Sequence, residues 1–405
     1  MSVILVIGTR PDAIKLIPVY QKLKQANIPT LLCATNQHRE LLDQVCNLFN
    51  VQPDISLNVM KENQNLEHIT STVLHKCSEL FSSYKPSVVI VQGDTTSSFA
   101  AALAAFYLSI PIAHVEAGLR TWDMHAPFPE EANRTFITKM ASLHFAPTPH
   151  NVGNLLKDGI NAQRIFCVGN TVVDALVSIK KGIESASISL STHVTKYVEV
   201  CKNNKQKIVF FSMHRRESFS GGLERALQAI IQAAQKYPDL SFFFPVHPNP
   251  HVQNEVELSG IKNIPNITCS VPLAYQDLCF VLSESTFVLT DSGGIQEESV
   301  SLGKRVAILR DCTERIEVMW DNMGTLVGTN KQKILNIIEI WHTKDNDILP
   351  QCTYGDGATA QRIVQVLVDH FGLLSDTHKP LTFTTQPIPT IMPLAMKTGI
   401  KGAGS

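Results

Sequence analysis

The chain has 405 residues, 44% of them hydrophobic, and a formal net charge of −1 at pH 7. This length suffices for two domains of ordinary size, each with its own core, and excludes a single small binding module. The near-neutral charge excludes a global attraction to nucleic acid or anionic lipid, so any anion site must be local.

Compartment and metal content are also constrained by the sequence. The chain enters a predicted strand directly, without a signal-peptide pattern, and no later stretch reaches about 18 apolar residues. Its nine cysteines form no CxxC pair, so neither a zinc site nor a disulfide framework is indicated. We therefore expect a soluble, cytoplasmic protein with free thiols, no metal site and no membrane segment.

Short β-branched runs alternate with amphipathic stretches of helix length through the first part of the chain. The predicted strands are SVILVIG, TLLCAT, SVVIVQG, PIAHVEA and LHFAPT, with helices over 12–26, 37–49, 95–108 and 148–157. Strands that are apolar on both faces and alternate with helices are typical of a parallel sheet covered on both sides.

A second series of the same kind follows a polar stretch at 184–206. Its strands are KIVFFSM, LSFFFPV, NITCSV, TFVLTD, RVAILR and GTLVGT, with helices over 220–236, 273–284 and 294–302. The pattern therefore predicts an α/β protein with two Rossmann-like, doubly wound parallel-sheet domains.

The domain boundary is predicted around Gly169–Thr171. We place one domain at 1–170 and the other at 171–356, with an amphipathic helix over 357–371 that returns to the first domain. The remaining residues, 376–405, are rich in Pro, Thr and Gly and are expected to form an accessory, flexible tail.

Polar motifs follow six of the predicted strands. They are Gly8-Thr9-Arg10-Pro11, Gly93-Asp94-Thr95, His114-Val115-Glu116, His214-Arg215-Arg216-Glu217, His247 and Asp291-Ser292-Gly293-Gly294. Ligands of open α/β sheets collect at the carboxyl ends of strands, so two facing sheets place a site in the cleft between them.

The turn Asp291–Gly294 leads from an apolar strand into a predicted helix. Its glycines let an anion approach the backbone N–H groups and the positive end of the helix. Glu297 and Glu298 would repel an anion, unless one of them accepts hydrogen bonds from a ribose diol. The segment thus indicates a nucleotide cradle, with a ligand-free structural turn as the alternative.

Two cations lie near the start of the first predicted helix, Arg10 in the turn and Lys15 in the helix. Cations there oppose the helix dipole unless an anion compensates them. We therefore expect both to help bind a phosphate-bearing substrate, and the alternative is that they are solvated surface charges.

Three acids, Asp94, Glu116 and Glu130, are predicted to converge on the cleft. Acids tuned apart by burial and neighbouring charges can abstract and return a proton at carbon. The alternative is structural: Asp94 caps the next helix, and the glutamates at 130 and 131 pair with Arg120 or Arg134.

His214 places a titratable ring beside two arginines, Arg215 and Arg216, which suit phosphate recognition unless one pairs with Glu217. His247 is separated from the next histidine by Pro-Asn-Pro, so no metal-binding helix face is predicted there. We favour a functional role for His214.

Taken together, these motifs resemble a known family. They are GTRPDAIKL, QHRELLDQV, QGDTTSSFAAALAAF, HVEAGLRT, PEEANR, GNTVVDAL, HRRESF, PVHPNP, LTDSGGIQEE and TERIE. In order and spacing, over residues 1–371, the chain resembles the non-hydrolysing UDP-N-acetylglucosamine (UDP-GlcNAc) 2-epimerases of bacteria. That family has a GT-B-like pair of Rossmann domains with the active site between them.

The resemblance implies interconversion of UDP-GlcNAc and UDP-N-acetylmannosamine (UDP-ManNAc) without a metal or nicotinamide cofactor. UDP would leave C1 by anti elimination to give 2-acetamidoglucal, and would then add back with a proton on the other face of C2. The product would supply ManNAc units for surface polysaccharide or glycoconjugate synthesis.

The resemblance also assigns roles to residues. The matching catalytic residues are Asp94, Glu116, Glu130 and His214. The matching substrate-binding residues are Arg10, Lys15, Ser292, Gly293, Gly294, Glu298 and Arg315. A homodimer is implied, as is a second, regulatory UDP-GlcNAc near Gln37–Gln44.

Three positions depart from the family pattern. Asp12 stands where Glu is usual, and Ile316 replaces the proline of the TERPE motif beside Arg315. Leu278 aligns with an aromatic residue near the uracil, so base stacking there is not expected.

Other activities compatible with this architecture are a hydrolysing epimerase, which releases ManNAc and UDP, a GT-B glycosyltransferase and a non-catalytic UDP-sugar sensor. The Pro-Asp-Ala-Ile-Lys run favours the non-hydrolysing reaction over the first. The three acids favour it over the other two.

Overall fold

The computed structural model describes residues 2–37, 39–61, 64–215, 218–219, 221–320, 323–344 and 352–373. The predicted tail at 376–405 lies outside the described residues, as do Arg216 and Glu217 of the His-Arg-Arg-Glu motif. Within the described part of the chain, no helix is long and apolar enough to cross a membrane.

The first unit is built on a seven-stranded parallel sheet with the order β3-β2-β1-β4-β5-β6-β7. Its strands are β1 (Val3–Ile7), β2 (Thr30–Ala34), β3 (Ile55–Ser56), β4 (Val88–Gln92), β5 (Ile112–Val115), β6 (Leu143–Ala146) and β7 (Ile165–Cys167). Its helices are α1 (Arg10–Gln25), α2 (Arg39–Leu48), α3 (Leu66–Tyr84), α4 (Thr96–Tyr107), α5 (Glu130–Met140) and α6 (Pro149–Lys157), with the 3-10 turn η1 (Ala162–Arg164).

The second unit is built on a six-stranded parallel sheet with the order β10-β9-β8-β11-β12-β13. Its strands are β8 (Lys207–Ser212), β9 (Leu240–Pro245), β10 (Ile267–Ser270), β11 (Ser285–Thr290), β12 (Arg305–Ile308) and β13 (Gly324–Leu326). Its helices are α8 (Thr192–Asn203), α9 (Gly222–Lys236), α10 (Pro250–Ser259), α11 (Tyr275–Glu284), α12 (Gly293–Ser301) and α13 (Lys331–Thr343), with 3-10 turns η3 (Ile261–Asn263) and η4 (Ile316–Met319).

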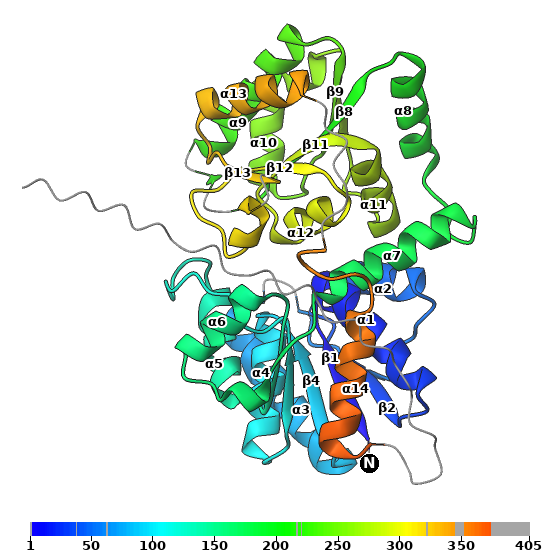
Figure 1. The fold of residues 1–405 in the computed structure, drawn as a ribbon, viewed down its shortest axis with the longest axis vertical. Coiled ribbons are helices and arrows are strands. Elements are labelled where there is room, and N and C mark those ends of the chain that lie inside the picture. The colour runs from blue at the N-terminus through cyan, green and yellow to red at the C-terminus, as the bar shows by residue number, and fades with distance from the viewer. Residues whose placement is uncertain are drawn as a thin grey trace, which may run out of the picture.

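The two sheets form separate lobes that face each other in Figure 1, with helices on both sides of each sheet. Every residue of β1 and β4 is buried, and apart from Gln92 at the end of β4 all of them are apolar, as expected for strands covered on both faces. The prediction of two doubly wound, GT-B-like units is confirmed.

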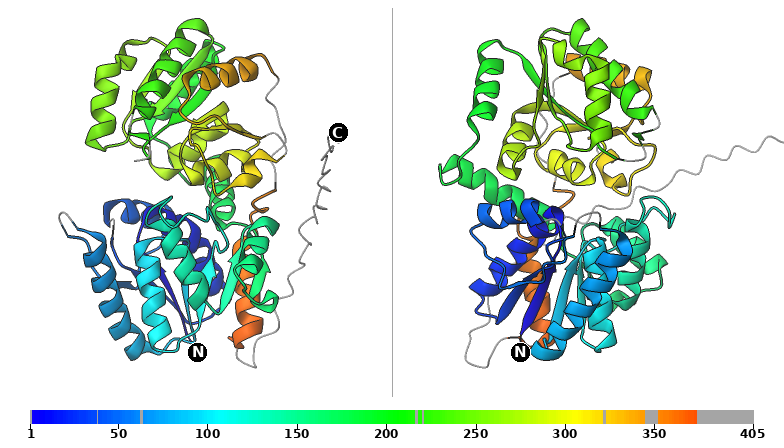
Figure 2. Two further views of the ribbon diagram at one scale, coloured as in Figure 1. Left: turned by 90° about the vertical axis from the view of Figure 1, so that its left-hand side faces the viewer. Right: turned by 180° about the vertical axis from the view of Figure 1, so that it is seen from behind.

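Helix α7 (Thr171–Glu184) lies where the lobes meet and packs against α1 on one side and α11 and α12 on the other (Figure 1). Asn170 caps its N-terminus by accepting the N–H of Val172 at 3.1 Å. The last helix, α14 (Thr359–Phe371), lies in the first lobe and packs against α1 and α7 (Figure 2).

Six helices in the described ranges were not predicted: α3, α5, α7, α8, α10 and α13. Helix α3 buries Ile69, Val73, Cys77 and Phe81, an i, i+4 stripe that the strand-centred interpretation overlooked. Helix α8 lies inside the polar stretch 184–206, where Val194, Val198 and Cys201 form a narrow buried face. In α8 the exposed polar positions outnumber this face, so the polar composition of the stretch did not indicate a helix.

Candidate active site

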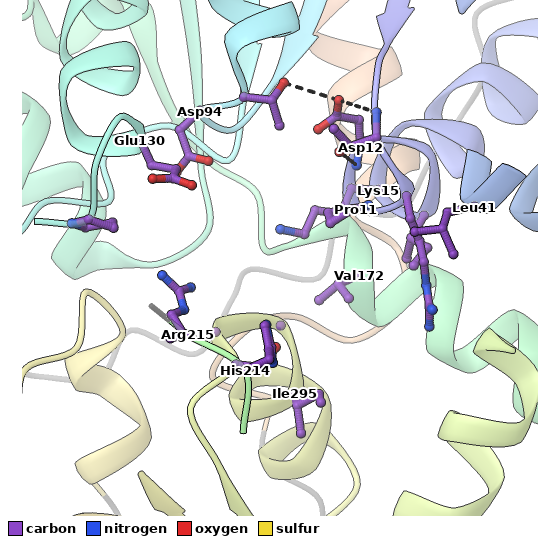
Figure 3. Close-up of a pocket in the computed structure, with 18 of the residues that line it drawn as sticks. Pro11, Asp12, Lys15, Leu41, Asp94, Glu130, Val172, His214, Arg215 and Ile295 are labelled. Carbon is purple, nitrogen blue, oxygen red and sulfur yellow. Dashed lines mark hydrogen bonds between the residues drawn. The ribbon is translucent and has the colours of Figure 1, made fainter. Parts of the chain in front are cut away.

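A cavity of about 720 Å³ opens between the two lobes, at the carboxyl edges of both sheets (Figure 3). Every predicted site residue lines it. From the first lobe these are Arg10, Lys15, Asp94, Glu116 and Glu130, and from the second His214, Ser292, Gly293, Gly294, Glu298 and Arg315. Residues up to 305 positions apart in the sequence are thus collected in one place because both sheets are parallel and face each other.

Asp94 and Glu130 lie side by side on the wall formed by the first lobe (Figure 3). Arg134 Nη2 is 2.5 Å from Asp94 Oδ2, and Asn133 Nδ2 donates to the Asp94 carbonyl at 2.9 Å. Burial and the charge of Asp94 raise the pKa of Glu130. One carboxylate is therefore paired with a cation, while the pKa of its neighbour is raised.

The structural roles considered as alternatives for Asp94 and Glu130, a helix cap and ion pairs with Arg120 or Arg134, are carried out by other residues. Thr95, not Asp94, caps α4 by accepting the N–H of Ser98 at 3.1 Å. Arg134 also approaches Glu131, at 3.4 Å, and the buried Arg120 pairs with Asp158 at 2.7 Å. Glu130 is left facing the cavity.

Glu116 is buried at the end of β5 in a left-handed backbone conformation, with φ +64°. Such a conformation is strained for a residue with a Cβ and is common at functional sites. Lys15 and Gln92 donate to its carboxylate, Asn170 Nδ2 donates to Oε1 at 2.8 Å, and Arg315 Nη2 lies 3.7 Å away.

These contacts favour the ionised form of Glu116. Burial opposes ionisation, but the charges of Lys15 and Arg315, with the hydrogen bonds from Lys15 and Asn170, hold the pKa of Glu116 below its usual range. Lys15 is itself buried, so it is not a solvated surface charge. The carboxylate of Glu116 compensates this cation, which would otherwise be costly near the start of α1.

The start of α1 also contains the first departure from the family pattern. Asp12 is fully buried, and its Oδ2 accepts the N–H groups of Gly8 and Thr9 at 2.9 and 3.0 Å. Together with Thr9 it forms a capping box, and burial raises its pKa to about 6. The short carboxylate therefore fits this position as a helix cap.

The wall formed by the second lobe is dominated by the N-terminus of α12. Ser292 is its N-cap and donates its own N–H to Thr290 Oγ1 at 3.0 Å. A Cβ on Gly293 would lie 2.3 Å from Arg315 Nη1, whereas one on Gly294 would meet no described atom within 4 Å. The first glycine makes room for Arg315, and the second leaves the helix end open to the cavity.

Arg315 is held by side chains rather than by the turn that follows it. Its Nε donates to Glu297 Oε1 at 2.5 Å and its Nη1 to Glu314 Oε1 at 2.6 Å. The 3-10 helix η4 begins at Ile316, where the family usually has proline. Two carboxylates therefore orient the guanidinium despite this substitution.

The two glutamates of α12 point in different directions. Glu298 lines the cavity, and burial raises its pKa to about 7. Glu297 is directed away from the open helix end, toward Arg315 and Asn170, and burial raises its pKa as well. Desolvation thus weakens the negative charge that follows the Ser-Gly-Gly turn.

His214 lies opposite Asp94 and Glu130, beside Arg215 (Figure 3). Its Nδ1 is 3.3 Å from Asp291 Oδ1. Asp291 Oδ2 accepts the backbone N–H groups of His214 and Arg215 at 2.8 and 2.7 Å. Asp291 thus orients the histidine, a role that its place before Ser-Gly-Gly did not suggest.

Other cavity residues were missed by sequence reasoning or behave differently from its expectations. His247 stacks on His214 with ring centroids 5.1 Å apart. Leu278 lines the cavity without an aromatic ring, next to Tyr275. At the predicted regulatory segment, Gln37 and Leu41 line the same cavity, while His38 lies outside the described residues.

Two further polar contacts join the lobes and do not involve the predicted catalytic acids. Arg10 Nη1 donates to the Leu273 carbonyl at 3.2 Å. Thr148 Oγ1 donates to the buried carboxylate of Glu317. In the described ranges, no group of three or more His, Cys, Asp or Glu side chains could hold a metal ion.

Comparison with known proteins gives consistent matches along the chain. The family model for UDP-N-acetylglucosamine 2-epimerase matches residues 21–368. A UDP-N-acetylglucosamine 2-epimerase of Yersinia pestis is 42% identical over 376 residues, which cover 91% of this chain and 99% of that protein.

Solved structures agree with the sequence matches. The UDP-GlcNAc 2-epimerase of Neisseria meningitidis bound to UDP-GlcNAc is 39% identical, with a TM-score of 0.84, covering 91% of this chain and 100% of that one. The S. aureus MnaA structure with UDP is 34% identical, with a TM-score of 0.84, covering 94% and 99%.

Proposed function

Because the chain belongs to the UDP-N-acetylglucosamine 2-epimerase family, we propose that it interconverts UDP-GlcNAc and UDP-ManNAc without net hydrolysis. One observation carries this proposal. The acids of the first lobe face the open helix end and Arg315 of the second lobe across a single cavity. Proton transfer at carbon and retention of a nucleotide diphosphate need these two kinds of surface at the same time.

The reaction proceeds in two balanced steps. A carboxylate removes the proton from C2 while the C1–O bond breaks, so the electron pair leaves with UDP and 2-acetamidoglucal forms. The UDP oxygen then bonds to C1 as an acid delivers a proton to the opposite face of C2. Two acid-base groups are needed because the two faces of C2 are served separately.

The environments of the acids support a division of roles among Asp94, Glu116, Glu130 and His214. Glu116 has a lowered pKa and is ready to accept a proton, whereas Glu130 has a raised pKa and is ready to donate one. Pairs of titratable groups that are tuned apart in this way are typical of acid-base sites. His214 faces Glu130 across the cavity and is oriented by Asp291.

The second lobe holds the leaving group in this proposal. Ser292, Gly293 and Gly294 present the start of α12 to the diphosphate, and Arg315 neutralises its charge. Glu298 accepts hydrogen bonds from the ribose diol. Arg10 and Lys15 complete the cation set from the first lobe. Tight diphosphate binding stabilises the leaving group and retains UDP until it adds back.

The test is incubation with UDP-GlcNAc in D2O, followed by NMR and mass spectrometry of the products. We expect UDP-ManNAc with deuterium at C2, together with deuterium in the recovered UDP-GlcNAc. Free ManNAc as the main product would instead establish a hydrolysing epimerase. Transfer of the sugar to an added acceptor, without C2 exchange, would establish a glycosyltransferase.

We also propose a wider setting for this activity. The protein acts in the cytoplasm as a homodimer and supplies ManNAc units for surface polysaccharide or glycoconjugate synthesis. Residues 1–170 with 357–371 act as one domain and 171–356 as the UDP-binding domain. A second UDP-GlcNAc regulates the enzyme near Gln37–Gln44, and dependence of the rate on added UDP-GlcNAc in the reverse reaction tests this.

A further inference from the structure

The side chain of Asn170 joins two carboxylates that come from different lobes. Its Nδ2 donates to Glu116 Oε1 at 2.8 Å and to Glu297 Oε2 at 2.6 Å. Its Oδ1 accepts the N–H of Val172, so the orientation of the amide is fixed by the cap of α7. Asn170 is 2% exposed and is not among the described residues that line the cavity.

The bridge extends in both directions from Asn170. On one side, Glu297 belongs to α12 and accepts a hydrogen bond from Arg315 Nε at 2.5 Å. On the other side, Glu116 accepts from Lys15 of α1. A continuous series of polar contacts therefore runs from the helix whose N-terminus faces the cavity to a carboxylate of the opposite wall.

We propose that Asn170 is a positioning residue that couples the seating of UDP on α12 to the orientation and ionisation of Glu116. This inference rests on the proposed function, because it takes Glu116 to act on the substrate in its ionised form. Asn170 acts through Glu116 and makes no contact with substrate itself.

The chemistry of the amide explains why asparagine suits this position. A neutral NH2 group offers two donors, one for each carboxylate, and so separates two negative charges that would otherwise repel each other in a buried site. An aspartate there would add a third acid. An alanine would leave Glu297 Oε2 without its donor and would leave Glu116 Oε1 with Lys15 as its remaining hydrogen-bond donor.

The coupling follows from the position of Glu297 in α12. When UDP occupies the end of α12, that helix holds Glu297 against Asn170, and Asn170 holds Glu116. When α12 shifts, Glu297 no longer holds the amide from that side, and only the cap of α7 keeps this donor on Glu116. Proton abstraction at C2 is then most effective only while the leaving group is held, which limits the loss of UDP during the elimination step.

The expected pH effect has a defined sign. The charged and titratable groups that face Glu116 are Lys15 from α1, Arg315 near η4, Glu297 from α12 and His114 on its own strand. Asn170 is one of the contacts that lower the pKa of Glu116, so its removal raises that pKa. The acidic limb of the kcat–pH profile should therefore move to higher pH.

The test compares Asn170→Ala and Asn170→Asp with Asp174→Asn as a matched control. Asp174 lies in α7 and accepts the N–H groups of Thr359 and Ala360, at 3.2 and 2.8 Å, so it caps α14. The control therefore removes a buried polar contact from the same helix without touching Glu116.

For Asn170→Ala, we expect kcat at pH 7 to fall about 10- to 100-fold, as for loss of a hydrogen bond to a charged group. The acidic limb should shift upward by about one pH unit, while the Kd of UDP changes less than about threefold. Asn170→Asp should shift the limb further. Asp174→Asn should lower the thermal midpoint and leave the limb in place.

The outcomes separate this inference from the proposed function. If wild-type protein exchanges the C2 proton but Asn170→Ala keeps the acidic limb unmoved, the coupling is wrong and the epimerase proposal stands. If wild-type protein shows no C2 exchange, the epimerase proposal is wrong. A crystal structure of Asn170→Ala with UDP then supplies a readout independent of activity, in which an unmoved Glu116 carboxylate contradicts the coupling.

Discussion

The carboxylates on the two walls of the cavity have different electrostatic environments. On the first-lobe wall, Asp94 pairs with Arg134 and Glu116 with Lys15, and the charges of Lys15 and Arg315 outweigh burial and lower the pKa of Glu116. On the second-lobe wall, Glu297 and Glu298 are buried in α12, and their pKa values are raised by desolvation. Glu130 is the exception on the first-lobe wall, because burial and the charge of Asp94 raise its pKa, so the contrast is between the cation-paired acids Asp94 and Glu116 and the buried glutamates of α12.

This difference explains an apparent conflict in the sequence. Two glutamates directly after an anion-binding turn should repel a diphosphate, yet burial reduces the charge on Glu298, and Glu297 is directed toward Arg315. The same helix can therefore present its positive end to an anion. The comparison assigns proton transfer to the first-lobe wall and anion binding to the second-lobe wall.

Asp94→Asn should have the largest effect on kcat, and it tests the assignment of proton transfer to the first-lobe wall. Removal of an acid from the first-lobe wall should lower kcat about 10²- to 10⁴-fold, the usual contribution of a general acid or base. The Kd of UDP should change less than about threefold, because Asp94 is not one of the residues assigned to the diphosphate. Steady-state kinetics and calorimetric titration with UDP measure the two effects.

Asp158→Asn is the matched control for that variant. Asp158 also pairs with a buried arginine of the first lobe, Arg120, at 2.7 Å, but it is not among the described residues lining the cavity. It should cost stability and leave kcat within about threefold of wild type. Equal loss of kcat in the two variants would mean that a broken ion pair, not a missing acid, causes the effect.

A pair of adjacent glycines tests the second-lobe wall. Gly294→Ala adds a Cβ that meets no described atom within 4 Å, so the thermal midpoint should not fall. The methyl group enters the space assigned to the diphosphate and should weaken UDP binding about tenfold, as for one misplaced methyl group in a binding pocket. Gly293→Ala places a Cβ 2.3 Å from Arg315 Nη1 and should lower both stability and UDP affinity.

The contrast between these variants is the informative result. Unchanged UDP affinity in Gly294→Ala would remove the start of α12 from the binding site. A normal thermal midpoint in Gly293→Ala would show that Arg315 can move aside freely, which would contradict its fixation by Glu297 and Glu314. Titration with UDP and thermal denaturation of each variant provide both measurements.

The sequence predicted the sheets and the cavity-facing residues well because both depend on local patterns. Continuous apolar runs mark parallel strands, and polar motifs at strand ends must meet at one edge of a sheet. The contacts of Asn170, Asp291 and Arg134 could not be predicted in this way. Each depends on which side chain of a distant segment faces it. Packing within one lobe decides this for Asp291 and Arg134, and the packing of the two lobes decides it for Asn170.

Helices were predicted less completely than strands, and the missed helices differ in how clearly their sequences show a helical period. The stripe of α3 from Ile69 to Phe81 has a clear helical period, so the signal was present in the sequence. In α8 only a narrow face is buried, and its polar surroundings hide the period. The direction of Glu297 away from the cavity likewise follows from Arg315, which lies 18 residues further along the chain.

The smallest effect on turnover is expected where the lobes touch outside the cavity. Thr148 Oγ1 donates to Glu317, a buried carboxylate whose Oε2 has no partner among the described residues, and neither residue is among those described as lining the cavity. Thr148→Val should cost about 1–3 kcal/mol of stability, because a buried acceptor loses its donor. Thr148→Ser keeps the hydroxyl and should behave like wild type in thermal denaturation. In both variants kcat should stay within about threefold of wild type, since the charges of the two walls are unchanged. A loss of kcat in Thr148→Val as large as that in Asp94→Asn would mean that turnover is limited by the spacing of the lobes rather than by the acids on the first-lobe wall.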